Sequence, residues 1–377
     1  MSAKRKIVIT TDWYYPGFKA GGPIRSVVNL IRAIENDFDI YVYASDRDLG
    51  ESESYPSVRA NEWNVVSNHK VFYSNKYSLD KILKEIAPDV LYINGIYSKN
   101  YSVKPLLTAK KQKFQGKIII SPRGMLSEGA LKIKTLKKKT FLTWTKTAKL
   151  YKNVLWHVTS TQEEQDLQKR VSKKVDYRFI NNISILPSVK KQNNEVSDVL
   201  KLVSVSRISS IKNLDFIIEI LLANEFKKAI HLDIFGNIEN EHYYKQCLSL
   251  INKYPKSRNK VSFKGEFNPN ELDTILLCYN LGIFPTKNEN FGHAIVECLS
   301  VGLPVIISDK TPWQNLEKYR CGFVLPLKKQ LWLNQLRELC EQSDNTFTDM
   351  SKNAANYFSE HIYSEEDKKK YVSLFLE

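Results

Sequence analysis

The sequence of 377 residues has no apolar run that approaches the ~20 residues a membrane-spanning helix requires. Its basic N-terminal residues are followed only by a short apolar-rich run, which we interpret as a first β-strand and not as a secretory signal peptide. These two absences predict a protein that is soluble or peripheral to a membrane.

Cysteine is scarce, and the few cysteines form no recognisable pattern. The chain has 5, all in its second half: Cys247, Cys278, Cys298, Cys321 and Cys340. They include no Cys-x-x-Cys pair and no His/Cys cluster with zinc-site spacing. An odd, scattered set predicts buried thiols in a reducing cytoplasm.

Two common nucleotide-binding signatures are also missing. No Gly-x-Gly-x-x-Gly follows a predicted strand, as an NAD-dependent dehydrogenase would require. Gly124 and Gly129 have the glycine spacing of a P-loop, but Ala130 stands where the essential lysine belongs. The sequence therefore predicts neither a dehydrogenase nor an ordinary P-loop enzyme.

Positive charge is present in excess, with a formal net charge of +15. Such an excess favours an anionic partner, which can be a nucleic acid, an anionic membrane surface or a phosphorylated substrate. The hydrophobic content of 42% with 11% aromatic residues is ample for packed cores. A chain of this length is expected to form two domains.

Short β-branched runs alternate with longer amphipathic segments, which predicts parallel sheets covered by helices on both faces. The expected strands are 6–10, 39–44, 89–94, 117–121, 200–206, 231–236, 261–264, 281–285 and 304–308. The expected helices are 25–34, 79–86, 214–222, 243–254, 269–278 and 293–301. The fold class is therefore α/β.

A polar segment without periodicity, residues 190–198, separates two such α/β series, and we place the domain boundary there. The first domain is expected to span residues 1–190 and the second residues 199–355. The remaining residues, 356–377, are amphipathic and are expected to form a terminal helix.

Ligands of open α/β sheets bind beyond the carboxyl ends of the strands, so the loops that follow strands are the first candidates for a site. Glu289 lies in the loop after strand 281–285, and Gly292 lets backbone approach a ligand closely. The first amides of the next helix can donate to an anion. Glu297 falls about one turn into that helix. Two carboxylates beside an anion site suit the hydroxyls of a sugar and a ribose; alternatively, they are ordinary solvated acids.

Two cations follow the first strand of the second series. Arg207 can form a forked contact with phosphate oxygens, and Lys212 can add a point charge. Taken alone, both are also compatible with surface salt bridges.

In combination, these segments resemble a known family. Ser206-Arg207 and Lys212-Asn213, then Glu289-Asn-Phe-Gly-x4-Glu297, then the segment 302–308, Gly-Leu-Pro-Val-Ile-Ile-Ser, closely resemble the retaining glycosyltransferases of family 4, with the GT-B fold. The resemblance is specific over about residues 200–308. It implies two Rossmann-like domains facing a central cleft, a nucleotide-sugar held mainly by the second domain, and a last helix that crosses back to the first domain.

The resemblance also implies roles for individual residues. Arg207 and Lys212 would bind the donor diphosphate and stabilise the leaving group, and Glu289 would contact donor-sugar hydroxyls; these three are the catalytic candidates. The donor-binding candidates are Gly22, Gly265, Asn290, Phe291, Gly292 and Glu297. Arg123 and His293 are candidates for contacts with the acceptor or the sugar, and Arg123 stands where many relatives carry a histidine.

No metal and no other cofactor is expected, because family members meet the leaving-group charge with Arg, Lys and helix amides. No protein nucleophile is assigned, since the resemblance implies a front-face displacement with retention of configuration.

A basic tract lies between Gly129 and Gln162, where no acidic residue occurs. It contains Lys137, Lys138 and Lys139, and apolar residues recur near helical spacing: Ile133, Leu136, Phe141, Trp144, Ala148 and Tyr151. This pattern predicts a basic amphipathic helix that docks on anionic lipid or guides a lipid-linked or oligosaccharide acceptor. The alternative is a core helix with a solvated lysine face.

The resulting hypothesis is a cytoplasmic glycosyltransferase, peripheral on the inner face of the membrane, that helps to build a cell-surface polysaccharide such as O-antigen, capsule or exopolysaccharide. The alternative from another class is a basic nucleic-acid-binding protein without catalysis, whose affinity would depend strongly on salt. The aromatic residues of the tract are few for stacking on bases, so no nucleic-acid partner is expected.

Overall fold

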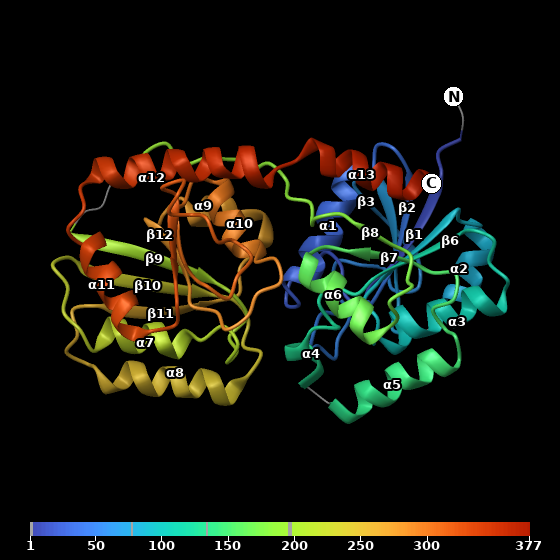
Figure 1. Cartoon of the computed structure of the whole chain (residues 1–377), viewed down its shortest axis with the longest axis horizontal. Coiled ribbons are helices and arrows are strands. Elements are labelled where there is room, and N and C mark those ends of the chain that lie inside the picture. The colour runs from blue at the N-terminus through green and yellow to red at the C-terminus, as the bar shows by residue number, and fades with distance from the viewer. Residues whose placement is uncertain (1–2, 77, 133–134, 195–197) are drawn as a thin grey trace. The chain divides into compact units, whose positions relative to one another are not determined.

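The computed structural model of the protein describes residues 3–76, 78–132, 135–194 and 198–377 (Figure 1). The chain divides into two compact units. Unit 1 comprises Met1–Ile183 with Glu365–Glu377, and unit 2 comprises Ser184–Ser364. Both units are α/β.

Unit 1 contains a sheet that is eight-stranded over the described residues, with the order β3-β4-β2-β1-β5-β6-β7-β8. All neighbouring strands are parallel except β3 and β4, which form an antiparallel hairpin at one edge. Its strands are β1 (Lys6–Thr10), β2 (Asp39–Ala44), β3 (Trp63–Val66), β4 (His69–Tyr73), β5 (Val90–Asn94), β6 (Lys117–Ser121), β7 (Leu155–Val158) and β8 (Tyr177–Phe179). Its helical segments are α1 (Gly22–Ile34), α2 (Leu79–Ile86), η1 (Lys99–Val103), α3 (Lys104–Lys111), α4 (Glu128–Lys132), α5 (Thr135–Thr147), α6 (Thr161–Arg170) and α13 (Glu365–Leu376).

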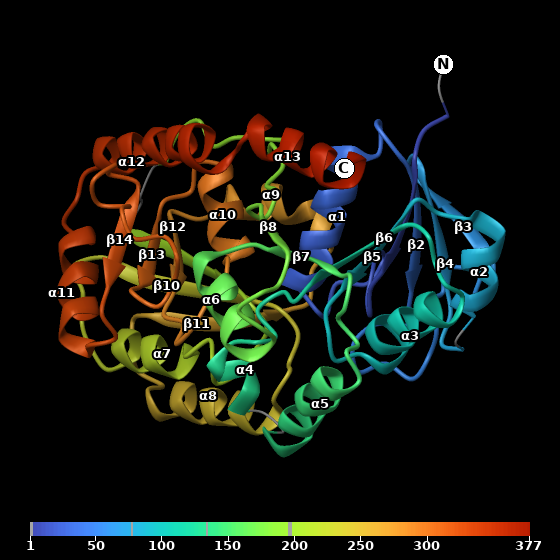
Figure 2. The same ribbon diagram turned by 45° about the vertical axis from the view of Figure 1, so that its right-hand side comes forward.

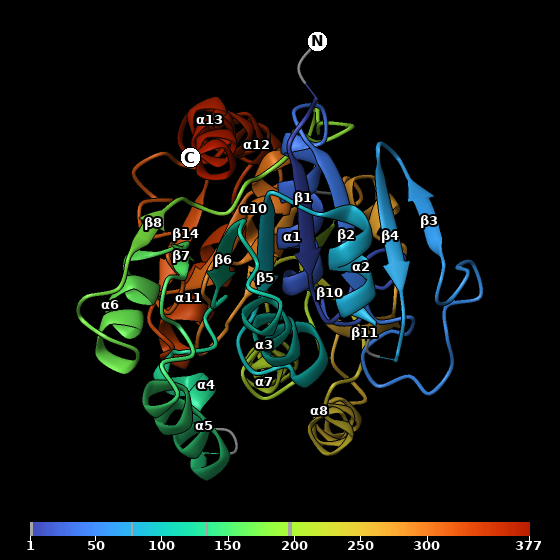
Figure 3. The same cartoon turned by 90° about the vertical axis from the view of Figure 1, so that its right-hand side faces the viewer.

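Side-chain alternation along β1 creates a core on each face of this sheet. Helices cover both faces (Figure 3). Ile7 and Ile9 pack with α1 and α13 in one core. Val8 points to the other face, where α2 and α3 supply the core. Because both faces are covered, the central strands are apolar at nearly every position, which is the pattern that the sequence shows.

Unit 2 contains a parallel sheet that is six-stranded over the described residues, with the order β11-β10-β9-β12-β13-β14. Its strands are β9 (Val199–Val205), β10 (Ala229–Phe235), β11 (Lys260–Gly265), β12 (Leu281–Phe284), β13 (Val305–Ser308) and β14 (Gly322–Leu325). Its helical segments are α7 (Leu214–Leu222), α8 (Glu241–Lys253), η2 (Pro269–Glu271), α9 (Leu272–Leu276), α10 (His293–Ser300), α11 (Lys329–Leu339), α12 (Asp344–Tyr357) and η3 (Phe358–Ile362).

The sheet of unit 2 is also covered on both faces (Figure 2). One core joins α7, α8 and α11 to alternate residues of β9 and β10. The second core joins α9 and α10 to the intervening residues of β9 and to β13.

Most elements expected from periodicity are present within one to three residues of their predicted bounds, and β1, β2, β6, α2 and α7 have the predicted bounds.

The polar segment expected to be a linker packs against unit 2. Ile183 closes unit 1, where its carbonyl accepts from Asn29 Nδ2 at 3.0 Å. Beyond it, Lys191 Nζ donates to the carbonyl of Leu277 at 2.7 Å, and the fully buried Asn194 donates to the carbonyl of Asn280 at 2.9 Å. The division between the units therefore precedes the polar stretch, because the polar side chains there are anchored by buried backbone carbonyls.

The C-terminal segment is not one continuous helix. Helix α12 passes into the π-helical turn η3, extended backbone at Tyr363 interrupts the helix, and α13 begins at Glu365. Helix α13 belongs to unit 1, where Tyr371, Leu374 and Phe375 are buried in the core. The interruption separates the residues that pack on unit 2 from those that pack on unit 1.

Within the described ranges, no helix is long and apolar enough to cross a membrane. All five cysteines are free thiols. Four of them are buried, whereas Cys278 is exposed and departs from the expectation of buried thiols. It lies just beyond α9, where its thiol contacts the carbonyl of Thr274 at 3.8 Å.

Candidate active site

The candidate site of unit 2 lies where the strand order reverses. Strands β10 and β11 extend to one side of β9, and β12 to β14 extend to the other. The loops that follow β9 and β12 consequently diverge from adjacent strand ends, which is where ligands bind in open α/β sheets. These loops are joined, because Lys287 N donates to the carbonyl of Ile211 at 2.8 Å and Thr286 Oγ1 donates to the same carbonyl at 3.1 Å.

At this point Lys212 and Glu289 form an ion pair, with Nζ 2.6 Å from Oε2. The two side chains are 18% and 22% exposed, so the pair is partly shielded yet open to a ligand. The backbone orients both residues: Lys212 N donates to Ser209 O at 2.9 Å, and Glu289 N donates to Lys310 O at 3.0 Å. The structure thus brings together a cation and a carboxylate that are distant in sequence, as a site for an anion beside hydroxyl groups requires.

The start of α10 adjoins this pair. Gly292 is the N-cap of α10 with a φ of 79°, a left-handed conformation that favours glycine. A Cβ added there would lie 3.1 Å from Cγ of Glu289, so the glutamate packs directly on the helix start. No side chain caps α10, and the first-turn amides of a helix have no partner within the helix. The carbonyl of Phe291 accepts from Trp313 Nε1 at 2.6 Å, which fixes the approach to the helix.

The other predicted residues of this segment surround the helix start. The rings of Phe291 and His293 lie 4.8 Å apart, and those of Phe291 and Trp313 lie 5.4 Å apart. Asn290, His293 and Glu297 are all half-buried. Glu297 lies on α10 one turn beyond the cap, as its spacing predicted.

Arg207 lies on the β10 side of the same sheet edge. Its Nη1 is 2.6 Å from Oε1 of Glu239, which belongs to the loop after β10. Among the described residues, Arg207 pairs with Glu239 and Lys212 pairs with Glu289, so the two predicted phosphate ligands have separate acidic partners. A diphosphate that bridged the two cations would have to replace Glu239 and Glu289 as their counter-charges.

Backbone packing holds the loops after β9, β10 and β11 together. Gly236 follows β10 with a φ of 141°, and its N–H donates to the carbonyl of Gly265 at 2.8 Å. Gly265 has a φ of 75° and nothing within 4 Å of an added Cβ. A Cβ added at Gly236, by contrast, would lie 2.0 Å from the carbonyl oxygen of Ser206.

We therefore expect Gly236→Ala to destabilise unit 2 by about 2–4 kcal/mol, since backbone strain and a backbone clash act together. Gly265→Ala is the matched control: it carries similar backbone strain without the clash and should cost about 1–2 kcal/mol. Urea unfolding followed by circular dichroism measures both. Equal losses for the two variants would contradict the assignment of a close approach at Gly236.

Two serines in this loop were not singled out from sequence. Ser206 Oγ and Ser209 Oγ are buried and, among the described residues, have no hydrogen-bond partner. Unsatisfied hydroxyls beside Arg207 and Lys212 are available to a polar ligand. A serine in a loop is too common a residue for its sequence position alone to mark it.

In unit 1, the guanidinium group of Arg123 is held by protein side chains. Nε donates to Asn94 Oδ1 at 2.8 Å, Nη1 donates to Asn182 Oδ1 at 2.5 Å, and Nη2 donates to Tyr92 Oη at 2.9 Å. Its backbone has a φ of 53°, which is unusual for arginine. This geometry positions Arg123 at the carboxyl ends of β5 and β6 and leaves it little freedom to move.

His157 is a fully buried core residue of β7. Its Nδ1 accepts from Tyr92 Oη at 2.8 Å, and its Nε2 donates to Ile180 O at 3.0 Å, which a neutral ring satisfies. Burial, with a further contribution from the positive charge of Arg123, lowers the pKa of His157 to about 3.

We expect this histidine to make unit 1 sensitive to acid. Because the pKa of the folded state lies below the unfolded value of about 6.5, its contribution is complete above that pH and is lost as pH falls towards 3, at about 1.4 kcal/mol per pH unit. His157→Gln keeps a donor and an acceptor but does not titrate. The free energy of unfolding should therefore decline less steeply between pH 7 and pH 5 in this variant than in the wild type; parallel declines would show that His157 does not titrate as inferred.

The sheet edge of unit 1 also contains a carboxyl group that sequence reasoning missed. Asp12 follows β1, and its Oδ1 accepts from Ser98 Oγ, which follows β5, at 2.6 Å. Burial raises the pKa of Asp12 despite that hydrogen bond. Because β1 and β5 are the strands where the order reverses, this pair occupies the position in unit 1 that Lys212 and Glu289 occupy in unit 2.

Two glycines stand at the start of α1. Gly22 is the first residue of α1, and Gly21 is its N-cap, with a φ of 65° and nothing within 4 Å of an added Cβ. The left-handed backbone conformation at this helix start is therefore that of Gly21.

Over the described residues, the basic tract contains α4 and α5, and α5 ends at Thr147, before Lys149, Tyr151 and Lys152. Ile133 and Lys134 lie outside the described residues. Lys138 does not share the outward face of Lys137 and Lys139: its Nζ donates to Ala130 O at 2.6 Å and lies 5.0 Å from the ring centre of Tyr97. The predicted apolar face is also divided, because Leu136 and Trp144 are 76% and 43% exposed.

Comparison with known proteins places this geometry in a family context. Residues 187–357, which fall within unit 2, match the model of the glycosyl transferases group 1. No curated protein matches the chain. Sucrose-phosphate synthase from Thermosynechococcus elongatus has a similar structure, with a TM-score of 0.76 at 16% identity, over 99% of this chain and 98% of that one.

Two further solved structures are similar over almost the full length of both chains. HepE from Anabaena, solved in complex with UDP-glucose, has a TM-score of 0.67 at 16% identity, over 98% of this chain and 99% of that one. WaaG, a glycosyltransferase involved in lipopolysaccharide biosynthesis, has a TM-score of 0.62 at 14% identity, over 97% and 98% of the two chains.

These matches confirm the predicted fold, which is the two-domain α/β fold of the GT-B glycosyltransferases. The family match at residues 187–357 identifies the chain as a transferase enzyme. This result opposes the alternative of a nucleic-acid-binding protein without catalysis.

Proposed function

Because residues 187–357 form a glycosyl transferases group 1 domain, we propose that this enzyme transfers a sugar from a nucleoside-diphosphate donor to an acceptor, with retention of anomeric configuration. The main support is the Lys212–Glu289 pair beside the start of α10, at the point where the strand order of unit 2 reverses. This arrangement offers a cation and helix amides for a diphosphate, and a carboxylate for sugar hydroxyls.

The proposed roles follow from these positions. Lys212 and Arg207 bind the diphosphate and stabilise it as it leaves, while Glu289 accepts hydrogen bonds from the donor sugar. The amides of the segment Asn290, Phe291 and Gly292 contact sugar and phosphate. Glu297 holds the ribose, and Gly265 leaves space for the nucleobase.

The chemical step requires charge stabilisation and not a protein nucleophile. The bond from the anomeric carbon to the diphosphate breaks as the acceptor oxygen attacks on the same face, and the leaving phosphate takes the acceptor proton. Preorganised cations and amides lower the barrier because they meet charge that develops on the leaving oxygen. We propose that this occurs without a metal ion or other cofactor.

A thermal-shift screen with nucleoside diphosphates and their sugars tests the donor proposal. A ligand at 100 times its dissociation constant should stabilise the folded protein by about 2.7 kcal/mol. The shift by nucleoside diphosphates, which carry the full charge of the leaving group, should be absent in Lys212→Ala and retained in Lys329→Ala, whose lysine lies on α11 and pairs with Glu219. If no nucleotide stabilises the wild-type protein, the proposed donor site is wrong.

For the acceptor, we propose a lipid-linked or oligosaccharide substrate in the synthesis of a cell-surface polysaccharide, with Arg123 and His293 as candidates for contacts with the acceptor or the sugar. Gly22 remains a proposed contact of the donor. We further propose that the enzyme works in the cytoplasm on the inner face of the membrane. The outward side of α5 supports this placement: Leu136 and Trp144 are exposed there, and Lys137 and Lys139 are exposed beside them. Apolar and aromatic residues flanked by lysines suit an anionic lipid surface.

We expect Lys137→Glu with Lys139→Glu to weaken binding to vesicles that contain phosphatidylglycerol by at least tenfold, because each basic residue near such a surface contributes about 1 kcal/mol. The same change at Lys81 and Lys84, exposed lysines of α2, is the control and should have little effect. Vesicle sedimentation measures both variants. Equal losses would show that binding depends on net charge and not on α5.

A further inference from the structure

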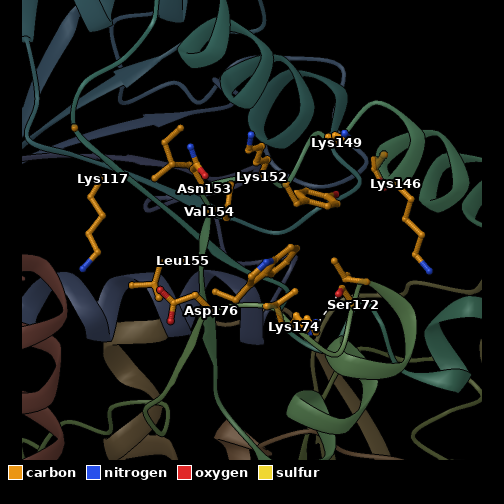
Figure 4. A pocket seen from close by; sticks show the side chains of 17 residues that line it. Lys117, Lys146, Lys149, Lys152, Asn153, Val154, Leu155, Ser172, Lys174 and Asp176 are labelled. Carbon is orange, nitrogen blue, oxygen red and sulfur yellow. Dashed lines mark hydrogen bonds between the residues drawn. The ribbon is translucent and has the colours of Figure 1, made fainter.

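Unit 1 contains a cavity of about 790 Å³ that the proposed sugar-transfer site does not use (Figure 4). It opens at the amino-terminal ends of β6 and β7, where Lys117 and Leu155 begin these strands. Arg123 follows the opposite, carboxyl end of β6. The residues that matter most for its chemistry are Lys117, Lys146, Lys149, Lys152, Lys174 and Trp156.

The lysines surround this cavity. Figure 4 shows Lys149 and Lys152 along one side, Lys174 along the opposite side, and Lys117 and Lys146 at the two ends. Within the described ranges, no carboxylate lies within 4.0 Å of the ammonium groups of Lys146, Lys149, Lys152 or Lys174. The cavity therefore concentrates positive charge without internal neutralisation.

The acidic residue that lines the cavity is already paired. Asp176 Oδ1 lies 3.2 Å from Nη1 of Arg178, and Arg178 also contacts Glu377 at 3.0 Å. Arginine thus competes for the carboxylate that could have neutralised the lysines. Like charges held around one cavity repel one another, and an anion bound between them would relieve that repulsion.

An unpartnered donor lies in the wall of the cavity. Trp156 is 1% exposed, and its Nε1 has no hydrogen-bond partner among the described residues. A buried indole N–H normally has a hydrogen-bond acceptor, so a ligand in the cavity could supply the acceptor that this atom lacks.

The pKa values of two lysines are also lowered. Burial lowers the pKa of Lys117, and it lowers the pKa of Lys110, where the charge of Lys152 adds to the effect. Bound negative charge would reverse both shifts.

We propose that this cavity binds a phosphorylated anion that carries at least two phosphate groups. The site is ancillary and lies at the amino-terminal ends of β6 and β7, whereas Arg123 lies beyond the carboxyl end of β6. The volume is within the range of small-molecule pockets, which is about 300–1,000 Å³. Lysine binds phosphate as a point charge. A single carboxylate would neutralise one lysine, whereas a polyphosphate matches several cations at once. The phosphates can belong to a free solute or to a lipid headgroup.

Titration calorimetry with inorganic tripolyphosphate tests the site. The titration uses Lys212→Ala as the background, so that the candidate donor site of unit 2 contributes little. In this background we expect saturable binding that weakens at least tenfold when Lys146, Lys149 and Lys152 are all replaced by Gln. The matched control replaces Lys81, Lys84 and Lys111, exposed lysines of α2 and α3, and should change the affinity less than twofold.

A second arm identifies the source of the phosphates. If vesicles containing cardiolipin, whose headgroup carries two phosphates, compete with tripolyphosphate, the natural ligand is a lipid headgroup. If they do not, it is a free solute, and the site stands in both cases. Tryptophan fluorescence should change on saturation, and Trp156→Phe should remove that change. The proposal is overturned if the binding of tripolyphosphate does not saturate. It is also overturned if the control triple variant loses as much affinity as the cavity variant, because the cavity lysines would then be ordinary charges near the end of α5.

Discussion

Replacement of Lys212 by alanine should lower the turnover of sugar transfer by about 10²–10³-fold, the loss observed when one preorganised donor to a developing negative charge is removed. The ammonium group is oriented by the backbone of its loop and lies 2.6 Å from Glu289. In our proposal the departing diphosphate takes over this contact, so the charge acts mainly after the donor bond begins to break. The effect should therefore appear in kcat more than in KM.

The measurement is the initial rate of transfer with a donor identified by thermal shift. Lys212→Arg keeps the charge with a different geometry and should recover part of the rate. Lys329→Ala removes a lysine of unit 2 whose ion pair with Glu219 is remote in sequence from the site, and it should retain the wild-type rate. A Lys212→Ala enzyme with an undiminished rate would remove the basis for the proposed site, as long as its unfolding temperature is also unchanged.

The second large effect concerns stability. Phe375→Ala should reduce the free energy of unfolding of unit 1 by about 3–5 kcal/mol, the usual cost of truncating a buried aromatic side chain. Phe375 is fully buried, and its ring lies 5.8 Å from the rings of both Phe38 and Tyr92. A loss of this size is a substantial part of the 5–15 kcal/mol that typically stabilises a domain.

The neighbouring residue provides the control. Leu376 is 50% exposed on the same helix, so Leu376→Ala should alter the free energy of unfolding by no more than about 0.5 kcal/mol. Tyr371→Phe removes a buried hydroxyl that donates to the carbonyl of Asn181 at 3.1 Å, and should cost about 1–2 kcal/mol. Urea unfolding measures the three variants. Similar small losses at Phe375 and Leu376 would show that α13 contributes little to unit 1.

Local patterns in the sequence predicted many elements well, because helix and strand periodicity act over a few neighbouring residues. The helices α2 and α7 and the strands β1, β2 and β6 have the bounds that their periodicity predicts. The hairpin of β3 and β4 was missed because its alternation is weak: Val65 is 76% exposed at the sheet edge. The helix expected over residues 356–377 was predicted as continuous because periodicity does not register the interruption at Tyr363.

For the candidate site, the sequence placed Lys212 and Glu289 in loops after strands but left open whether they meet. Their contact depends on the order of the strands in the sheet. Strand β9 (Val199–Val205) must lie beside β12 (Leu281–Phe284), although 75 residues separate the end of one from the start of the other. Lys138 illustrates the same limit, because its sequence neighbours point outwards while its own ammonium group contacts Ala130 and Tyr97.

By itself, the sequence determined the α/β class and most of the secondary structure, and it supplied the candidates that we propose for diphosphate chemistry. The tertiary structure decided which loops share a strand edge, that α13 completes the core of unit 1, and that lysines of separate segments surround one cavity. The physical reason is that propensity and periodicity are local. The neighbour of a strand or the partner of a charge, by contrast, is selected by the burial and packing of the whole unit.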